Sequence, residues 1–544
     1  MKFFSVGSAL AGLLCLIAFS FSAASQSPAP VTTDQHASEI RELHRELDAI
    51  SARLTALESQ GSGNEDHAVA HGPSTQPAIA STSSSSTETV GKSNKVEVSS
   101  AQAPSESTSE PSTAPSTAVD TKTPFAFADF TWLNGNPRTK DTPYATKFFT
   151  PEYRSDVSYT YDFRHPQDDT IVGSSEVFRA NEVTLTDLGI GGDLHLNNVR
   201  ARVLSQLGLY STAIPANDAS SARGQFNLAN AYRYVAEANA GYHFNVQHGL
   251  NVDAGLFLSY VGLFSFYQFD NWAYQPSYVS SNTPWFFNGV RVQWFPTNKL
   301  KIEPWVVNGW QSYGKFNNRP GVGGQILWRP SGKLQVLGNQ YALGEDALNT
   351  PGRVRYHTDD SVEYKYYDRP DSLISKAAFT VTGDAGCEHG GGVSCAGDSI
   401  KNGVFAPKQS FLGFMAYNRL WFHRDLFGMT IGGGRINNPG RYLVLLPPIN
   451  GATAASGTPY FTENPGEPFK AWDTSLTLDY LPSQYFTYRL EYNHRAADVP
   501  YFAGPGGVTP PGGNTGAPGS LVPGFTPDLV YSENRVTAAF LVKF

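Results

Sequence analysis

The chain has 544 residues, of which 40% are hydrophobic and 13% aromatic, and its formal net charge is −8 at pH 7. An acidic chain has no surplus of cations to neutralise phosphates, which argues against a nucleic-acid partner. The length also exceeds that of one ordinary small domain.

Residues 1–25 predict a secretory signal peptide. Lys2 is the only charged residue of this stretch, and an apolar run over residues 3–21 is followed by small residues. We expect cleavage near Ala24 or Ser25. A signal anchor is the less favoured alternative, because a polar tract follows at once. No later stretch is long and apolar enough for a membrane-spanning helix, so only a closed barrel could cross a bilayer.

Residues 34–60 predict a coiled-coil stalk. Apolar residues recur alternately three and four positions apart, as in the heptads of a coiled coil, at Ile40, Leu43, Leu47, Ile50, Leu54 and Leu57. Ile and Leu occupy both core positions, which leaves dimer and trimer open, and a lone amphipathic helix is the alternative. Residues 61–123, rich in Ser, Thr and Pro, predict a disordered linker that could reach peptidoglycan. Residues 124–152 form a pre-barrel segment.

Residues 153–544 predict an all-β fold, a transmembrane antiparallel β-barrel of about sixteen strands. Apolar and polar residues alternate, so each strand has an apolar face and a polar face. Several polar faces carry two or more ionisable groups, which a packed core would exclude and a water-filled lumen accepts. The strands are expected to begin near Tyr153, Val177, His195, Ala231, Leu250, Phe286, Lys299, Val322, Lys333, Ser361, Ser375, Ser410, Leu426, Ala471, Tyr485 and Glu533.

The connections between these strands alternate between short and long. The short ones are residues 296–298, 330–332, 369–373, 423–425 and 482–484. The long ones are residues 209–230, 262–285, 343–360, 383–409, 437–470 and 496–532. Outer-membrane barrels have short periplasmic turns and long external loops. Counting back from a periplasmic C-terminus places every short connection inside, a regularity that a soluble all-β protein does not require.

The last strand, residues 535–544, has an apolar face that ends at the terminal residue Phe544. An exposed apolar edge invites aggregation in water, but not when the strand closes a barrel in a membrane. The ending is similar to the signature by which outer-membrane barrels enter the barrel-assembly machinery, and it assigns Phe544 as an assembly signal. The alternative is the last strand of a soluble sandwich.

Cys387 and Cys395 predict a local disulfide, because both lie in a Gly-rich stretch of a secreted chain. A metal site with His389 is the alternative, although two thiols and one His do not complete a zinc set. No cofactor is expected. Residues 356–360 and 168–169 are interpreted as solvated acidic loops rather than cation sites. The sequence lacks nucleophile-elbow, phosphate-loop and zinc-protease motifs, so we do not expect an enzyme.

Several segments together resemble one known family. They are FFTPEY at residues 148–153, Gly192-Asp193, NWAYQPSY at residues 271–278, residues 305–310 and the ending at residues 534–544. Over roughly residues 125–544 the chain resembles the OmpL-like β-barrel porin-2 family of Gram-negative bacteria. The resemblance implies an outer-membrane pore and carries over no substrate and no functional residue.

The third external loop, residues 264–285, is expected to fold into the lumen and constrict it, as the third loop does in sixteen-stranded porins. So many aromatic residues would be unusual on a solvated loop. The alternative is packing against a neighbouring loop or protomer. The predicted constriction residues are Phe266, Tyr267, Phe269, Asp270, Trp272, Tyr274 and Tyr278.

Charged residues on the polar strand faces are expected to line the lumen. The cations are Arg233, Arg291 and Arg489, and the anions are Glu237, Asp253, Glu303 and Glu491. Opposed across a constriction, they would create a transverse field. The alternative is simple salt bridges between neighbouring strands.

These observations favour an outer-membrane porin that passes small hydrophilic solutes, sugars among them, by passive diffusion. A homotrimer in outer-membrane lipid, with the stalk in the periplasm, suits this function. The alternative is an anchor that tethers the envelope to peptidoglycan through the stalk, with the barrel holding it in the membrane.

Overall fold

The computed structural model describes residues 119–136, 141–173, 177–216, 218, 220, 228–264, 266–281, 283–315, 317–346, 350–397, 408–438, 469–513 and 524–544. The predicted signal peptide, the predicted stalk and nearly all of the predicted linker lie outside these residues. Those three assignments therefore stay predictions.

Sixteen antiparallel strands form one closed barrel, as the alternation of residues predicted. The strands are β1 (Phe149–Asp162), β2 (Val183–Leu196), β3 (Val199–Ser205), β4 (Val235–Phe244), β5 (Leu250–Leu258), β6 (Phe286–Thr297), β7 (Leu300–Val307), β8 (Gly321–Ser331), β9 (Leu334–Ala342), β10 (Val354–Asp368), β11 (Ile374–His389), β12 (Ser410–Phe422), β13 (Phe427–Asn438), β14 (Phe469–Ser483), β15 (Phe486–Ala497) and β18 (Ser532–Lys543).

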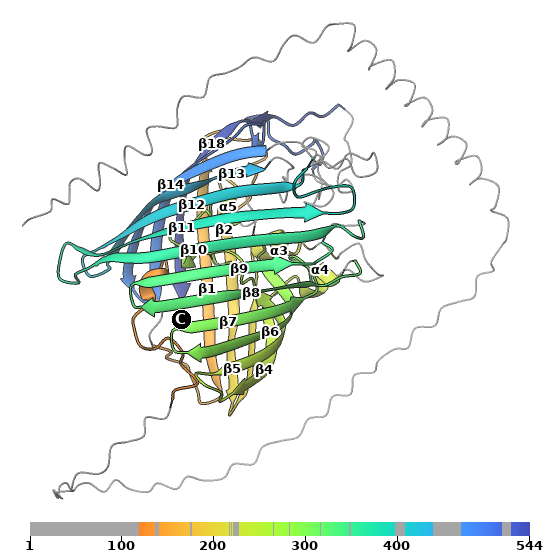
Figure 1. Cartoon of the computed structure of the whole chain (residues 1–544). Coiled ribbons are helices and arrows are strands. Elements are labelled where there is room, and N and C mark those ends of the chain that lie inside the picture. Colours follow the sequence, from red (N-terminus) through yellow and green to blue (C-terminus); the bar gives the residue numbers. More distant parts are fainter. Residues whose placement is uncertain are drawn as a thin grey trace, which may run out of the picture. The chain divides into compact units, whose positions relative to one another are not determined.

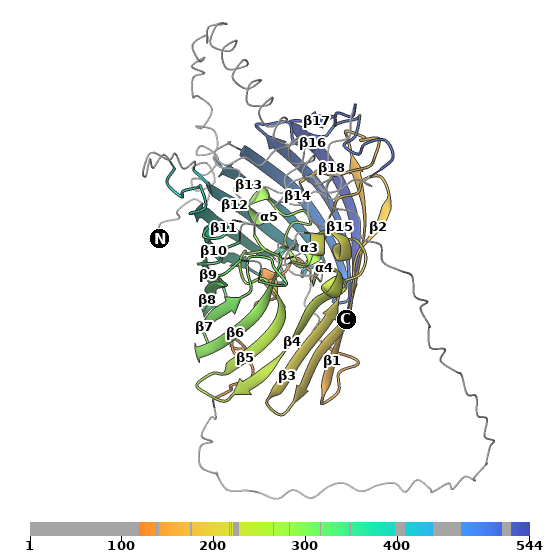
Figure 2. The same cartoon turned by 90° about the vertical axis from the view of Figure 1, so that its right-hand side faces the viewer.

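The barrel follows the order of the chain. Each strand pairs with the next, and β18 closes the ring by pairing with both β15 and β1. In the closing pair Arg154 lies opposite Lys543 and Asp162 opposite Arg535. Figure 1 shows β5 to β12 side by side in sequence order along one wall. Two short strands, β16 (Phe502–Ala503) and β17 (Leu529–Val530), form a separate sheet within the last long loop, near one rim of the barrel (Figure 2).

The two faces of the wall differ in polarity, because side chains alternate along each strand. In β10, Arg355, Asp359 and Glu363 are buried toward the lumen, whereas Val362 and Tyr364 are exposed on the outside. The outer surface carries large exposed apolar residues on many strands, including Ile190, Val203, Tyr242, Val290, Val306, Ile326, Trp328, Leu412, Ile431, Leu478 and Leu490. Such a surface suits hydrocarbon rather than water.

Short turns gather at one end of the barrel and long loops at the other, as the connection lengths predicted. We call these the turn end and the loop end. The described loop residues contain three helices, α3 (Tyr210–Ala216), α4 (Leu228–Tyr232) and α5 (Tyr278–Ser281), and the 3-10 turn η2 (Gln268–Asp270). A second 3-10 turn, η1 (Thr131–Leu133), precedes β1. None of the helices in the described part of the chain has the length and apolarity needed to span a membrane.

Two boundaries of the predicted long loops are displaced more than the others. β10 begins at Val354, so residues 354–360 belong to a strand and not to a loop over 343–360, and β11 continues to His389. The acidic stretch at residues 356–360 was therefore wrongly interpreted as external. His357 and Asp359 are buried toward the polar lumen, whereas Tyr356 and Asp360 are exposed on the outer side. This strand therefore has the polar composition of a solvated loop.

The terminal residue Phe544 takes part in closing the barrel. Its backbone N–H donates to the Tyr153 carbonyl at 3.0 Å, and the Tyr153 N–H donates to the Phe544 carbonyl at 2.7 Å. The two rings are stacked, with centroids 5.1 Å apart. The ring is thus placed beside the seam at which the first and last strands meet.

Replacing Phe544 with alanine is expected to lower outer-membrane insertion several-fold. The seam loses its stacked aromatic pair, and the barrel-assembly machinery loses the terminal aromatic residue that it is expected to recognise. Secretion across the inner membrane should not change. Quantitative blots of outer-membrane and periplasmic fractions at native expression measure both steps. Wild-type outer-membrane levels in this variant would refute the role given to the terminus.

Candidate functional site

The loop between β5 and β6, residues 259–285, lies inside the barrel and is bonded to strands of the far wall. We call it L3. The Tyr274 hydroxyl donates to Asp156 Oδ1 of β1 at 3.1 Å. The Gln275 N–H donates to Glu491 Oε1 of β15 at 2.8 Å, and the Ser277 hydroxyl donates to Asp473 Oδ2 of β14 at 2.7 Å. Strands β14 and β15 stand about half-way around the ring from β6, so L3 crosses the lumen.

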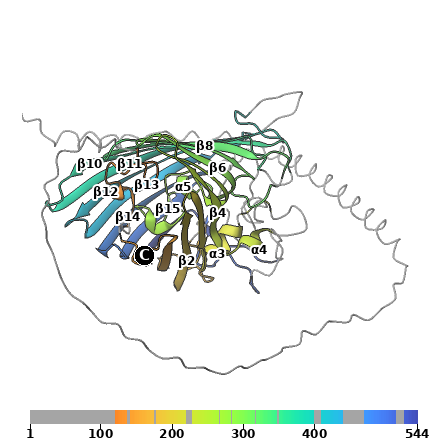
Figure 3. The ribbon, with the colours of Figure 1, turned by 90° about the horizontal axis from the view of Figure 1, so that it is seen from below.

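The aromatic residues of L3 fill the space between the loop and the wall. Trp272 packs edge-on against Trp421 of β12, with ring centroids 5.8 Å apart. Tyr278, at the start of α5, packs against Phe469 of β14 at 6.2 Å. Figures 2 and 3 place α5 within the ring of strands. The predicted aromatic residues of L3 are all buried: Phe266, Tyr267, Phe269, Trp272, Tyr274 and Tyr278.

Asp270 of L3 is held by cations from the barrel seam. Arg154 Nη2 lies 2.9 Å from Asp270 Oδ2, and Lys543 Nζ lies 3.7 Å from Asp270 Oδ1. Burial alone would raise the pKa of this carboxyl, but Arg154 and Lys543 outweigh it and hold the pKa well below its ordinary 3.8. A depressed pKa means that the ion pair is fully present above pH 3.8 and is lost only as the pH falls through the lower folded-state value.

The segment before β1 also enters the lumen, from the turn end. The Trp132 indole N–H donates to the Gly332 carbonyl in the β8–β9 turn at 3.1 Å, and the Trp272 indole N–H donates to the Trp132 carbonyl at 3.3 Å. The Asn136 side-chain amide donates to the Phe269 carbonyl at 2.7 Å. The pre-barrel segment and L3 therefore meet inside the barrel.

Two arginines and one carboxylate form a buried cluster beneath this meeting point. Arg419 Nη1 lies 2.6 Å from Asp479 Oδ2, and Arg489 Nε lies 2.6 Å from Asp479 Oδ1. All three side chains have an exposed fraction of 0%. Both guanidinium groups also donate to the Gly135 carbonyl, at 2.8 and 3.3 Å. This cluster supports the loop and the pre-barrel segment rather than facing open space.

The opposite wall, formed by β2 to β6, carries ion pairs that remain partly accessible. Arg291 Nε lies 3.2 Å from Asp253 Oδ2, and these residues are directly opposed on β6 and β5. Arg202 Nε lies 2.9 Å from Glu237 Oε1. Glu303 of β7 is buried and accepts a hydrogen bond from Gln293 at 3.2 Å. Arg291 and Glu237 therefore form salt bridges between nearby strands, and the Arg291 guanidinium also lies over the Phe257 ring at 4.3 Å.

Arg233 does not join this group. The alternation of Arg233 with two tyrosines predicts a lumen-facing strand position, and this prediction is wrong. Strand β4 begins only at Val235. Its pairing with β3 shifts register between Leu204 and Ser205, where the regular alternation breaks. Arg233 is exposed in the preceding loop, where its Nε donates to the Ser211 carbonyl at 3.1 Å.

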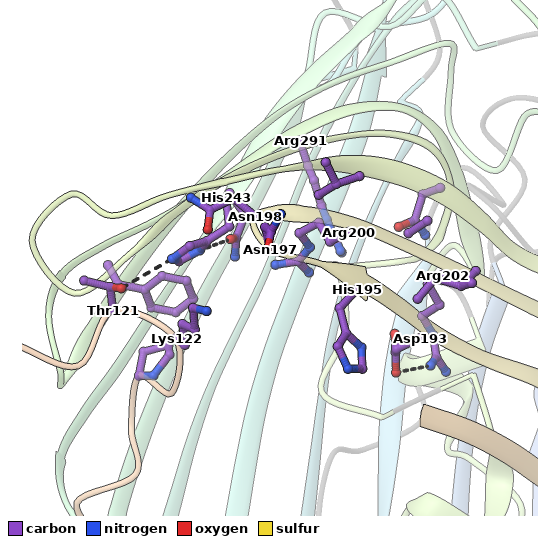
Figure 4. A pocket seen from close by; sticks show the side chains of 17 residues that line it. Thr121, Lys122, Asp193, His195, Asn197, Asn198, Arg200, Arg202, His243 and Arg291 are labelled. Atoms are coloured by element: carbon purple, nitrogen blue, oxygen red, sulfur yellow. Dashed lines mark hydrogen bonds and ion pairs between the residues drawn. The ribbon is translucent and has the colours of Figure 1, made fainter. Parts of the chain in front are cut away.

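A cavity of about 430 Å³ opens beside the β2–β6 wall at the turn end. Figure 4 shows Arg200, Arg202 and Arg291 along it, with Thr121 and Lys122, from the end of the predicted linker, on its other side. Amide and imidazole side chains complete the lining, at His195, Asn197, Asn198, Asn239, His243 and Asn251. The cavity offers many hydrogen-bond donors and acceptors, several cations and one carboxylate, that of Asp193.

Residues 155–522 match the sequence family described as "Putative beta-barrel porin-2, OmpL-like". The chain belongs to this porin family. Similar solved structures include the outer membrane channel DcaP of Acinetobacter baumannii, at 10% identity over 73% of this chain and 97% of that chain, with a TM-score of 0.42. An anion-selective porin from Comamonas acidovorans matches at 10% identity over 73% and 99%, with a TM-score of 0.41. OprB of Pseudomonas putida matches at 10% identity over 73% and 94%, with a TM-score of 0.41. The comparison with curated proteins found no match.

Membership of the porin family relates the two ends of the barrel to the two sides of an outer membrane. Porin barrels carry short turns on the periplasmic side and long loops outside. The turn end of this porin, where the C-terminus and the pre-barrel segment lie, is therefore the periplasmic end. L3 starts from the external end, and the pre-barrel segment starts from the periplasmic end.

A disulfide joins Cys387 and Cys395 of this porin, with Cα atoms 5.1 Å apart. It links the external end of β11 to the loop that follows. His389, the third member of the alternative metal set, is exposed, and no metal-binding group of three or more His, Cys, Asp or Glu side chains occurs among the described residues.

Sequence reasoning left the part of the porin around Trp132 and Gly135 without a position. A signal was present, because Phe125, Phe127, Phe130 and Trp132 follow a linker with almost no aromatic residues. Such a change in composition indicates a segment that packs against something. Its partner lay far along the chain, since Gly135 contacts residues 284 and 354 positions away.

Proposed function

We propose that this porin forms a water-filled channel for the passive diffusion of small hydrophilic solutes, sugars among them. The observation that carries the proposal is that arginine side chains on two sides of the lumen differ in their exposed fraction. The side chains of Arg200, Arg202 and Arg291 on the β2–β6 wall are 37%, 21% and 17% exposed, whereas Arg419 and Arg489 on the opposite side are fully buried. Solutes would pass along the accessible wall, and L3 would limit the cross-section.

The mixture of charges along this wall favours neutral polar solutes. Arg202 lies within 3.0 Å of carboxylate oxygens of Glu152, Asp193 and Glu237, so its charge is largely compensated. The cavity keeps amide donors and acceptors and one aromatic ring, Phe295. Hydroxyl-rich solutes use donors and acceptors together and can stack on rings.

Liposome swelling with sugars of increasing size tests the proposal. Vesicles with the wild-type protein should swell rapidly with monosaccharides and slowly with large oligosaccharides. Asn239 lines the cavity and its neighbour Ala240 is exposed on the outer face, so the two provide a matched pair. Asn239→Trp should slow swelling several-fold, and Ala240→Trp should not. Equal rates in both variants, or no swelling with any sugar, would contradict the proposed channel.

We also propose a homotrimer in the outer membrane. Its support is the heptad seam at residues 34–60 together with membership of a porin family. A chain lacking residues 34–60 should retain sugar permeation, because the barrel is closed without them.

A further inference from the structure

The described residues that precede β1, 119–136 and 141–148, contact turns on different sides of the periplasmic mouth of the barrel. The Thr121 hydroxyl donates to Asn245 Oδ1 in the β4–β5 turn at 2.8 Å. Further along, the Arg329 guanidinium lies over the Phe130 ring at 4.4 Å, near the β8–β9 turn. The segment reaches the β14–β15 turn at Asp141, whose carboxylate accepts a hydrogen bond from the Gln484 amide at 2.7 Å. We call residues 119–136 and 141–148 the mouth strap.

The strap is buried inside the lumen at Gly135. The Gly135 carbonyl accepts hydrogen bonds from both Arg419 and Arg489, which in turn hold Asp479. A Cβ atom at this position would overlap the backbone carbonyl of Asn271 in L3 and would also press on Arg489. Only glycine fits between the loop and the arginines, so the strap and L3 are fitted to each other at this point.

The strap also borders two cavities at the periplasmic mouth. Thr121, Lys122 and Pro124 line the cavity of about 430 Å³ beside the β2–β6 wall. Thr131, Trp132, Asn134 and Asn136 line a second cavity of about 470 Å³ beside the turns that follow β12 and β14. Removing the strap would take away one wall of each cavity.

We propose that the mouth strap forms the second half of the constriction, and that its seat at Gly135 sets the size limit of the pore from the periplasmic side. The inference rests on the proposed channel function. L3 narrows the lumen from the external end, the strap narrows it from the periplasmic end, and solutes leave beside the strap. Displacing the strap widens the pore without any change in the barrel wall.

Gly135→Ala is the sharpest test, because the space between Gly135, the Asn271 carbonyl of L3 and the Arg489 guanidinium cannot accommodate one added methyl group. Gly383→Ala is the matched control, since a Cβ there meets nothing within 4 Å. A cysteine introduced at Asn136, which is 5% exposed, reports the position of the strap through labelling by a membrane-impermeant maleimide in proteoliposomes. Planar-bilayer recording of the same full-length proteins reports the pore. A third variant, with residues 131–135 replaced by a Gly-Ser linker of equal length, keeps the reporter cysteine at position 136 and keeps the test valid if Gly135→Ala folds poorly.

We expect Gly135→Ala and the linker variant to raise both the labelling rate and the unit conductance several-fold, and Gly383→Ala to change neither. Faster labelling of Gly135→Ala with unchanged conductance would contradict the role of the strap as a constriction, but not the proposed channel function. Unchanged conductance in the linker variant would lead to the same conclusion. Silence of every variant would overturn the channel function itself.

Discussion

Removing residues 267–278 is expected to raise the unit conductance several-fold and to admit larger sugars. The deleted stretch contains Tyr267, Phe269, Trp272, Tyr274 and Tyr278, all buried between L3 and the barrel wall. Their bulk occupies cross-section that water would otherwise fill. Stacking of rings on sugar faces adds a second restriction, because it slows passage. Single-channel recording and liposome swelling measure the two effects separately.

A point variant and an outward-facing control separate lumen bulk from general damage. Trp272→Ala removes an indole that packs on Trp421 inside the barrel, and Trp472→Ala removes one that is 46% exposed on the outer face. Only Trp272→Ala should raise the conductance. If L3 instead contributes to contacts between protomers, the deletion would leave unit conductance unchanged and loosen the oligomer on a mild-detergent gel, which would contradict its role as a constriction.

Replacing Asp479 with alanine is expected to destabilise the barrel by about 3 to 5 kcal/mol, the range typical of a buried ion pair that loses one partner. The physical reason is that Arg419 and Arg489 would remain buried side by side without the carboxylate that compensates them. The shift of the urea midpoint in lipid vesicles, followed by heat-modifiable gel mobility, measures the loss.

Asp371→Ala is the control for this effect. Asp371 also pairs with an arginine, Arg424, at 3.0 Å, but the two side chains are 86% and 78% exposed. Exposed pairs contribute little to stability, so the urea midpoint should not move. If Asp479→Ala also left the urea midpoint unchanged, water would have to reach the buried cluster of Arg419, Arg489 and Asp479. The hydrogen bonds from the two arginines to Gly135 would then hold the strap less firmly than we infer.

The barrel could be predicted from the sequence because its cause is local. Lipid outside and a polar lumen inside impose alternation on every strand, and the rule of short periplasmic turns fixes which connections are short. Most strand starts were placed within a few residues, as at Tyr485 for a strand that begins at Phe486. The largest displacement, at Ser361 for a strand that begins at Val354, arose where lumen-facing residues such as His357 and Asp359 look like a loop.

The interior of the lumen could not be predicted in the same way, because it depends on contacts between distant segments. The sequence indicated aromatic residues in L3 but not which wall they would meet. It indicated Arg489 and Glu491 as lumen charges but not that L3 would cover them. The seat of Gly135 requires L3, β12 and β15 together, and no local pattern around a single glycine encodes that arrangement.

Single-channel recording of the wild-type protein in planar bilayers tests the central claim most directly. A channel whose lumen is narrowed but left open along the β2–β6 wall should give discrete, ohmic current steps, and a trimer should close in three equal steps. Silence across several lipid compositions and voltages, from protein that has the gel mobility of a folded barrel, would contradict the account.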